Sequence, residues 1–160
     1  MNSPATSVPA TGPDASSPAR RLQVGDTFQT DIPIRWGDLD SLAHLNNAVY
    51  FRLMEEARAQ MVRLAGVPYP PGQGMVLAHA SCDFLRSFTY PETVRIVHIV
   101  TKLGRTSIEC ELVMSRASDP SATPYARART VLVWVDLERS VSLPWPEPIL
   151  QGLGAHMCPA

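Results

Sequence analysis

One segment of the sequence, residues 47–65, has the periodicity of a helix, and the segments that follow it have the periodicity of strands. Between 47 and 65, apolar side chains recur at intervals of three and four, and Gly66 and Pro68 stand where the helix should end. Apolar residues alternate with others over residues 75–85, 93–103, 107–115 and 126–136. An earlier strand is predicted over residues 27–36, where Pro33 favours a place at a sheet edge.

Most joins between the later strands are short and contain turn residues, which favours antiparallel pairing of neighbours. A long apolar helix beside about five antiparallel strands can bury its apolar face if the sheet curls around it. The sequence therefore predicts an α+β fold, in which a curled antiparallel sheet of about five strands wraps around one long central helix. Such a sheet keeps open edges, and edge-to-edge pairing in a homodimer would cover one of them.

Length and charge narrow the class of protein. A chain of 160 residues suits one domain with its own core, and a formal net charge of −1 argues against a nucleic-acid-binding protein, which would need a basic excess. The three cysteines show no CxxC spacing, and no metal-binding motif is present. We find no apolar run long enough to span a membrane and no basic start followed by an apolar segment. We therefore expect a cytoplasmic protein without membrane contact.

The ends of the chain differ from its middle. Residues 1–21 are rich in Ser, Pro, Ala and Thr, and too poor in large apolar residues to offset the entropy of ordering, so a disordered tail is expected. The domain itself is expected over residues 22–146, and residues 147–160 form a C-terminal extension. Three apolar residues of that extension are expected to dock a short turn on the domain: Ile149, Leu150 and Leu153.

Polar residues gather just ahead of the predicted helix, in the stretch RWGDLDSLAHLNNAVYF, residues 35–51. Asn46 or Asn47 is a natural N-cap, and a helix start offers free backbone N–H groups and the positive end of the helix dipole. A carboxylate such as that of Asp38 or Asp40 near these donors suits attack on a carbonyl, because the N–H groups can hold the developing oxyanion. The alternative is that Asp38 and Asp40 serve only in turn and cap formation.

The same stretch resembles the acyl-CoA thioesterases of the hotdog fold, in the 4-hydroxybenzoyl-CoA thioesterase-like family. The motifs that match are Gly-Asp-x-Asp at 37–40, the loop at 43–47, Tyr50, and Glu-Glu-Ala-Arg at 55–58. The resemblance covers roughly residues 27–146, and its combined motifs are more specific than Asp-x-Asp alone. It implies hydrolysis of an acyl-CoA thioester to a carboxylic acid and coenzyme A by a homodimer or homotetramer, with coenzyme A thioester as substrate and no other cofactor.

The resemblance also assigns roles to individual residues. It makes Asp40 the catalytic carboxylate and the backbone N–H near Asn47 the oxyanion site. His44 matches a position that many but not all members fill with histidine, where it could orient water or the loop, and Asp38 is expected to fix the loop or its donors. At position 43 the family often has glycine, and Ala43 fits without strain only if its φ is below zero.

A thioester is a substrate that a site with a single catalytic carboxylate can hydrolyse. An aspartate with the usual pKa of about 4 is a weak base, whereas a thiol with a pKa of about 8.5 leaves readily as thiolate. The carboxylate can attack the carbon or activate water, and the sequence leaves this choice open. Coenzyme A carries phosphates and amides, so basic and hydroxyl side chains are expected to bind it. The candidates are Arg86, Arg105, Thr106 and Ser107.

Other readings of the same residues remain. A hotdog dehydratase would use His44 and Asp40 for proton transfer, and consumption of an enoyl-CoA would identify it. A non-catalytic acyl-CoA binding module would use Asp40 only as a cap, and absence of thiol release from acyl-CoA would identify it. Glu55 or Glu56 on the helix could replace Asp40 as the carboxylate, although a surface ion pair of Glu55 with Arg58 is the simpler reading.

Overall fold

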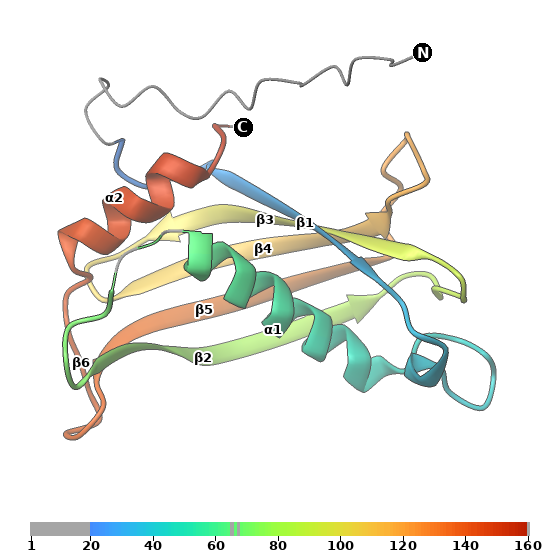
Figure 1. The fold of residues 1–160 in the computed structure, drawn as a ribbon, viewed down its shortest axis with the longest axis horizontal. Coiled ribbons are helices and arrows are strands. Elements are labelled where there is room, and N and C mark those ends of the chain that lie inside the picture. The colour runs from blue at the N-terminus through green and yellow to red at the C-terminus, as the bar shows by residue number, and fades with distance from the viewer. Residues whose placement is uncertain (1–19, 65, 67, 160) are drawn as a thin grey trace, which may run out of the picture.

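The computed structural model describes residues 20–64, 66 and 68–159 (Figure 1). Its elements, in chain order, are β1 (Thr27–Pro33), the 3-10 turn η1 (Trp36–Asp38), α1 (Asn47–Leu64), β2 (Gln73–Phe84), β3 (Thr93–Leu103), β4 (Ser107–Arg116), β5 (Ala126–Asp136), β6 (Val141–Ser142) and α2 (Glu147–His156). Every pairing is antiparallel, in the order β1-β3-β4-β5-β2, with β6 on β5. The predicted curled antiparallel sheet is confirmed, but within the described residues it has six strands where about five were expected.

Helix α1 lies across one face of the sheet (Figure 1). Its buried side chains follow the interval of three and four that the sequence shows: Tyr50, Leu53, Met54, Ala57 and Met61. In β4 and β5, alternate residues are buried, so each strand turns one row of apolar side chains toward the same core. Burying one large apolar side chain contributes about 1.5–3 kcal/mol, so the two periodicities together hold helix and sheet in one core.

The two edges of the sheet differ. β1 is one edge, as Pro33 predicted, and the strand ends at that proline, three residues before the expected end. β2 is the other edge and runs for 12 residues. Large apolar side chains of β2 are exposed to solvent, among them Leu77 and Phe84, each 43% exposed. A long edge with exposed apolar residues is a surface on which another strand can pair.

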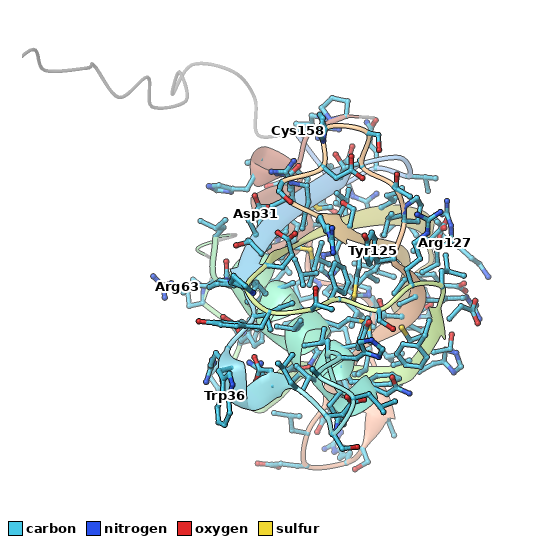
Figure 2. All side chains as sticks on the ribbon, turned by 90° about the vertical axis from the view of Figure 1, so that its right-hand side faces the viewer. Asp31, Trp36, Arg63, Tyr125, Arg127 and Cys158 are labelled. Atoms are coloured by element: carbon cyan, nitrogen blue, oxygen red, sulfur yellow. The ribbon has the colours of Figure 1, made fainter. Side chains whose placement is uncertain are left out.

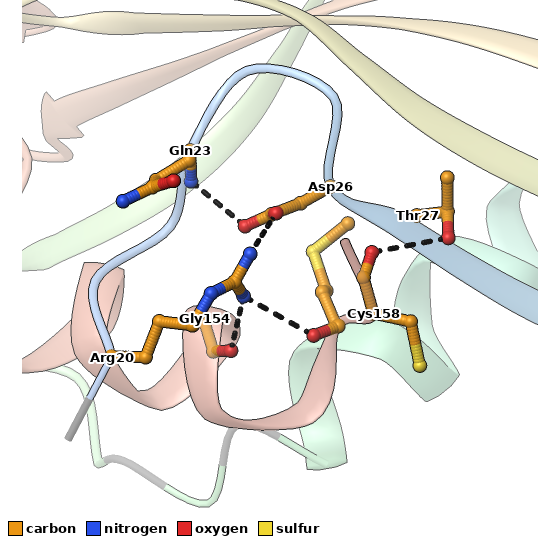
Figure 3. Close-up of polar contacts among 7 residues, drawn as sticks. Arg20, Gln23, Asp26, Thr27, Gly154 and Cys158 are labelled. Atoms are coloured by element: carbon orange, nitrogen blue, oxygen red, sulfur yellow. Dashed lines mark hydrogen bonds and ion pairs between the residues drawn. The ribbon is translucent and has the colours of Figure 1, made fainter. Parts of the chain in front are cut away.

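Helix α2 is fastened to the start of the described chain (Figure 3). The Arg20 guanidinium donates to the carbonyl oxygens of Gly154 at 3.0 Å and Met157 at 3.3 Å, and it pairs with the buried Asp26 carboxylate. The other oxygen of Asp26 accepts the backbone N–H of Gln23 at 2.8 Å. These bonds close the C-terminal helix onto the segment that leads into β1.

The expected docking of the C-terminal extension is observed, by a helix of 10 residues instead of a short turn. Ile149, Leu150 and Leu153 are all buried. Of the tail predicted over residues 1–21, residues 1–19 lie outside the described part, while Arg20 is bonded as above and Arg21 pairs with Glu147 at 3.1 Å. None of the helices in the described part has the length and hydrophobicity that crossing a membrane requires.

Gly154 lets α2 approach the N-terminal segment closely. A Cβ at this position would lie 2.2 Å from the carbonyl oxygen of Arg20 and 2.5 Å from backbone atoms of Arg21 and Leu22. Because those atoms belong to the backbone, Gly154→Ala should separate the two segments and lower the free energy of unfolding by about 2 kcal/mol. Urea unfolding measures the change, with Ala155→Leu at the exposed neighbouring position as control. Equal stability of Gly154→Ala and wild type would contradict the close packing.

Candidate active site

The two aspartates of the Gly-Asp-x-Asp motif have different surroundings, because η1 turns the chain between the strand and the helix. Asp38 is 8% exposed, and its Oδ2 accepts the backbone N–H of Arg35 at 2.9 Å and lies 2.8 Å from Nη2 of Arg52 on α1. Its carbonyl oxygen accepts the backbone N–H of Asn46 at 3.0 Å. Asp38 therefore ties the loop to the helix, which confirms the expectation that it fixes the loop.

The half-buried Asp40 carboxylate is held by one of its two oxygens. Oδ1 accepts the backbone N–H of Leu42 at 2.8 Å and that of His44 at 3.0 Å. The backbone N–H of Asp40 donates in turn to the carbonyl oxygen of His44 at 2.7 Å. Oδ2 makes no hydrogen bond or ion pair with any residue that the structure describes. One oxygen thus fixes the orientation of the side chain, and the other stays available.

Ala43 closes this loop in the left-handed region, with a φ of 58°. The condition that the sequence set for an unstrained alanine, a φ below zero, is not met. The chain keeps the conformation that glycine would adopt most easily, at a cost of about 1 kcal/mol for a residue with a Cβ. The backbone N–H of Ala43 donates to the carbonyl oxygen of Asp40 at 3.1 Å, which helps to keep the turn closed.

The start of α1 faces the same loop. Asn46 is the N-cap, because its Oδ1 accepts the backbone N–H of Ala48 at 2.9 Å and its carbonyl oxygen accepts that of Val49 at 2.8 Å. The backbone N–H of Asn47, the first helical residue, has no acceptor among the described residues. This donor lies at the positive end of the helix dipole, where negative charge is favoured.

Asp40, His44, Asn47 and Arg86 line one cavity of about 160 Å³, which we name the Asp40 cleft. Tyr50 and Phe84 also line it, with their rings edge to face and their centroids 4.9 Å apart. The structure therefore brings together all three predicted catalytic residues and one of the predicted coenzyme A contacts.

The remaining predicted coenzyme A contacts lie elsewhere in the chain. Arg105 and Thr106 lie in the turn from β3 into β4, and Ser107 is the first residue of β4. Ser107 pairs with Val133 of β5, near the end of β5 that is farther from the Asp40 cleft. Phe84 of the cleft stands opposite Ala126, at the other end of β5. Within one chain the two groups are thus separated by most of the length of the sheet.

Trp36 was missed by the sequence reasoning as a feature of the site. It begins η1, is 78% exposed, and projects into solvent from the loop that carries Asp40 (Figure 2). Its only signal in the sequence was an aromatic residue among polar ones directly before Gly-Asp-x-Asp. Together with Asp40 and Ala43 it lines a separate hollow, and a large exposed aromatic side chain is a contact surface for a ligand or another chain.

A second cavity, of about 50 Å³, lies between α1 and the inner face of the sheet, and we name it the α1–β2 pocket. Phe51, Met54, Leu77 and Leu132 give it apolar walls, while Arg58, His98 and Thr130 add polar groups. Arg58 pairs with Glu55, as the spacing of three predicted, and Glu56 lies 3.6 Å from Arg52. The sequence reasoning missed His98 and Thr130, whose signal was a polar residue at an inward position of an alternating strand.

Burial controls the protonation of His98. The side chain is 2% exposed, and desolvation followed by the nearby Arg58 charge lowers its pKa from 6.5 to about 4. The imidazole is therefore neutral at neutral pH. The Nδ1 atom has no hydrogen-bond partner among the described residues.

Comparison with known proteins places the chain in a family. The sequence profile of the thioesterase-like superfamily matches residues 34–153. The PA2801 protein of Pseudomonas aeruginosa, a proposed thioesterase, is 32% identical, with a TM-score of 0.71, over 79% of this chain and 96% of its own. The 1,4-dihydroxy-2-naphthoyl-CoA thioesterase Slr0204 of Synechocystis is 20% identical, with a TM-score of 0.71, over 79% of this chain and 95% of its own. YsmA of Bacillus subtilis is 23% identical over 131 residues, which are 81% of this chain and 87% of YsmA.

The fold and these matches define a thioester hydrolase of the hotdog class. The chain belongs to the thioesterase-like superfamily, as the resemblance in the sequence predicted.

The buried His98 should make stability depend on pH. Its folded-state pKa, about 4, lies below the unfolded value of 6.5, so the unfolded state binds more protons between these values and stability falls as pH decreases through that window. The free energy of unfolding should drop by about 2 kcal/mol from this group between about pH 7.5 and about pH 5. Urea unfolding of wild type and His98→Leu at both pH values isolates the effect. Equal pH dependence in the two proteins would contradict it.

Proposed function

We propose that the protein hydrolyses an acyl-CoA thioester to a free carboxylic acid and coenzyme A, with Asp40 as the catalytic carboxylate. One observation carries the proposal: Asp40, whose Oδ2 has no partner among the described residues, and Asn47, whose backbone N–H has no acceptor among them, line the same cleft. The first can supply or activate a nucleophile, and the second can receive the oxyanion that forms. No metal or redox cofactor takes part in the proposed reaction.

The reaction follows from these two groups. The thioester carbonyl oxygen accepts the Asn47 N–H, and negative charge builds on it as the carbon becomes tetrahedral. In one route, Oδ2 takes a proton from water while the water oxygen bonds to the carbon. In the other, Oδ2 itself bonds to the carbon, the C–S bond breaks to leave an anhydride with Asp40, and water then cleaves this anhydride to the free acid. In both routes, breaking of the C–S bond releases coenzyme A as thiolate, so no strong acid is required.

We also propose that two chains pair through their β2 edges as a homodimer. Antiparallel pairing of β2 with its copy places the Phe84 end of one strand beside the Gln73 end of the other. Gln73 stands at the same end of the sheet as the turn with Arg105, Thr106 and Ser107. The partner subunit's Arg105 would therefore lie at the end of the dimer that holds the Asp40 cleft. This arrangement lets one coenzyme A contact Arg86 of one chain and the turn of its partner.

Asp40→Asn tests the catalytic role while sparing the loop. The amide oxygen of asparagine can still accept the Leu42 and His44 N–H groups, but the free anionic oxygen is replaced by a neutral NH₂ group. We expect the kcat for thiol release from acyl-CoA to fall by about 10²–10⁴. The Michaelis constant and the unfolding midpoint should stay near the wild-type values. A disulfide reagent that reports free thiol gives the rate.

Two further variants complete this experiment. Asp31→Asn removes an exposed carboxylate of β1 that pairs with Arg95, away from the cleft, and should keep wild-type turnover. Asp40→Ala removes both oxygens, so it should lose turnover as well. If Asp40→Asn released thiol within about threefold of the wild-type rate, Asp40 would not be the catalytic carboxylate.

A further inference from the structure

The lining residues of the α1–β2 pocket follow those of the Asp40 cleft along α1 and along β2, although the two cavities share no lining residue. Asn47 and Tyr50 line the cleft, and Phe51, Met54 and Arg58 line the pocket on the following turns. On β2 the lining passes in the same direction from Phe84 to Ala80 and Leu77. An acyl group attached at the Asn47 end and directed along α1 would therefore point its far end into the pocket.

Two polar atoms of the residues that line this pocket lack hydrogen-bond partners among the described residues. His98 is 2% exposed, and its Nδ1 has no hydrogen bond with any described residue. The Nη1 atom of Arg58 is buried and equally without a partner in the described part of the chain. A buried donor or acceptor left unpaired destabilises the protein, so a ligand that paired with both atoms would bind more tightly than one that left them unpaired.

The charge in the pocket selects the kind of group that fits. Arg58 is already paired with the Glu55 carboxylate, and His98 is neutral, so the pocket carries little net positive charge to balance an anion. Arg58 offers a donor, and a neutral imidazole can donate or accept at Nδ1 according to its tautomer. A hydroxyl or a keto carbonyl oxygen can pair with these groups without bringing a charge.

We propose that the substrate's acyl group carries a neutral oxygen at its far end, and that Arg58 and His98 bind this oxygen in the α1–β2 pocket. The proposal rests on the thioesterase function of the Asp40 cleft. From Asn47 to Met54 the helix rises about 10 Å, at about 1.5 Å per residue, which sets the distance from the thioester carbon to the oxygen. A volume of about 50 Å³ holds only a few non-hydrogen atoms, so the terminal group is small.

The test compares two thioesters that differ by one oxygen. An extended chain of about eight carbons spans the required distance. We expect kcat/KM for 8-hydroxyoctanoyl-CoA to exceed that for octanoyl-CoA by about tenfold or more, because the plain chain leaves Arg58 and His98 unpaired. In Arg58→Met and in His98→Leu this ratio should fall to about one or below. Two variants are used, and urea unfolding of each shows whether it is folded.

The outcomes separate this proposal from the one on which it rests. Asp40-dependent hydrolysis with equal kcat/KM for the two thioesters would overturn the oxygen-binding pocket and leave the thioesterase function standing. A wild-type preference that persists in both variants would also overturn it. If neither thioester were hydrolysed, the thioesterase function would be contradicted. The pocket would then be tested by calorimetry, as the ratio of the dissociation constants of the two thioesters. An 8-carboxyoctanoyl-CoA preferred over both would show that the pocket takes an anion, against the proposal.

Discussion

The hydrogen bonds from the Leu42 and His44 amides to one oxygen of Asp40 are the constraint on which the site depends. A carboxylate on a free loop would sample many orientations, whereas here one oxygen is fixed and the other is left for chemistry. The loop is closed by Ala43 in a left-handed conformation and tied to α1 by Asp38 through Arg52. In the proposed reaction, the cost of that strained residue is small beside the gain of holding the Asp40 carboxylate in place.

The fold brings the end of a strand and the start of a helix to the same cleft. β1 ends at Pro33, η1 turns the chain, and Asn46 caps α1 so that the Asn47 N–H stays free. β2 ends beside it at Phe84, and Arg86 follows the strand. The carboxylate, the proposed oxyanion donor and a basic side chain therefore come from three separate segments. Along α1, the lining then changes from the polar cleft to an apolar pocket with polar groups inside it.

The long helix and strands could be predicted from the periodicity of apolar residues, because a helix and a strand each bury one face at a fixed repeat. The helix over 47–65 and the strands over 93–103 and 126–136 agree with α1, β3 and β5 to within a residue where the structure describes them. Three features escaped the reading of local patterns. β6 is a two-residue strand, too short to show alternation. The C-terminal docking was expected as a short turn, whereas α2 is a helix whose carbonyl groups are bonded to Arg20, far away in sequence. His98 lies in a pocket whose walls come from four elements, which no local pattern describes. The position of Asp40 beside the start of α1 could be predicted, since its motif, loop and cap are contiguous, while its catalytic role stays a prediction.

The most direct test of the proposed roles of Asp40 and Asn47 is a structure of the protein with a non-hydrolysable acyl-CoA analogue in which a ketone replaces the thioester. We expect the ketone oxygen within about 3 Å of the Asn47 backbone nitrogen, with Asp40 Oδ2 facing the carbonyl carbon. The phosphates of the analogue should contact Arg86 of the chain that binds the ketone and the partner subunit's Arg105, with the two chains paired through their β2 strands. A ketone bound beside Glu55, with Asp40 turned away from the ligand, would contradict the account.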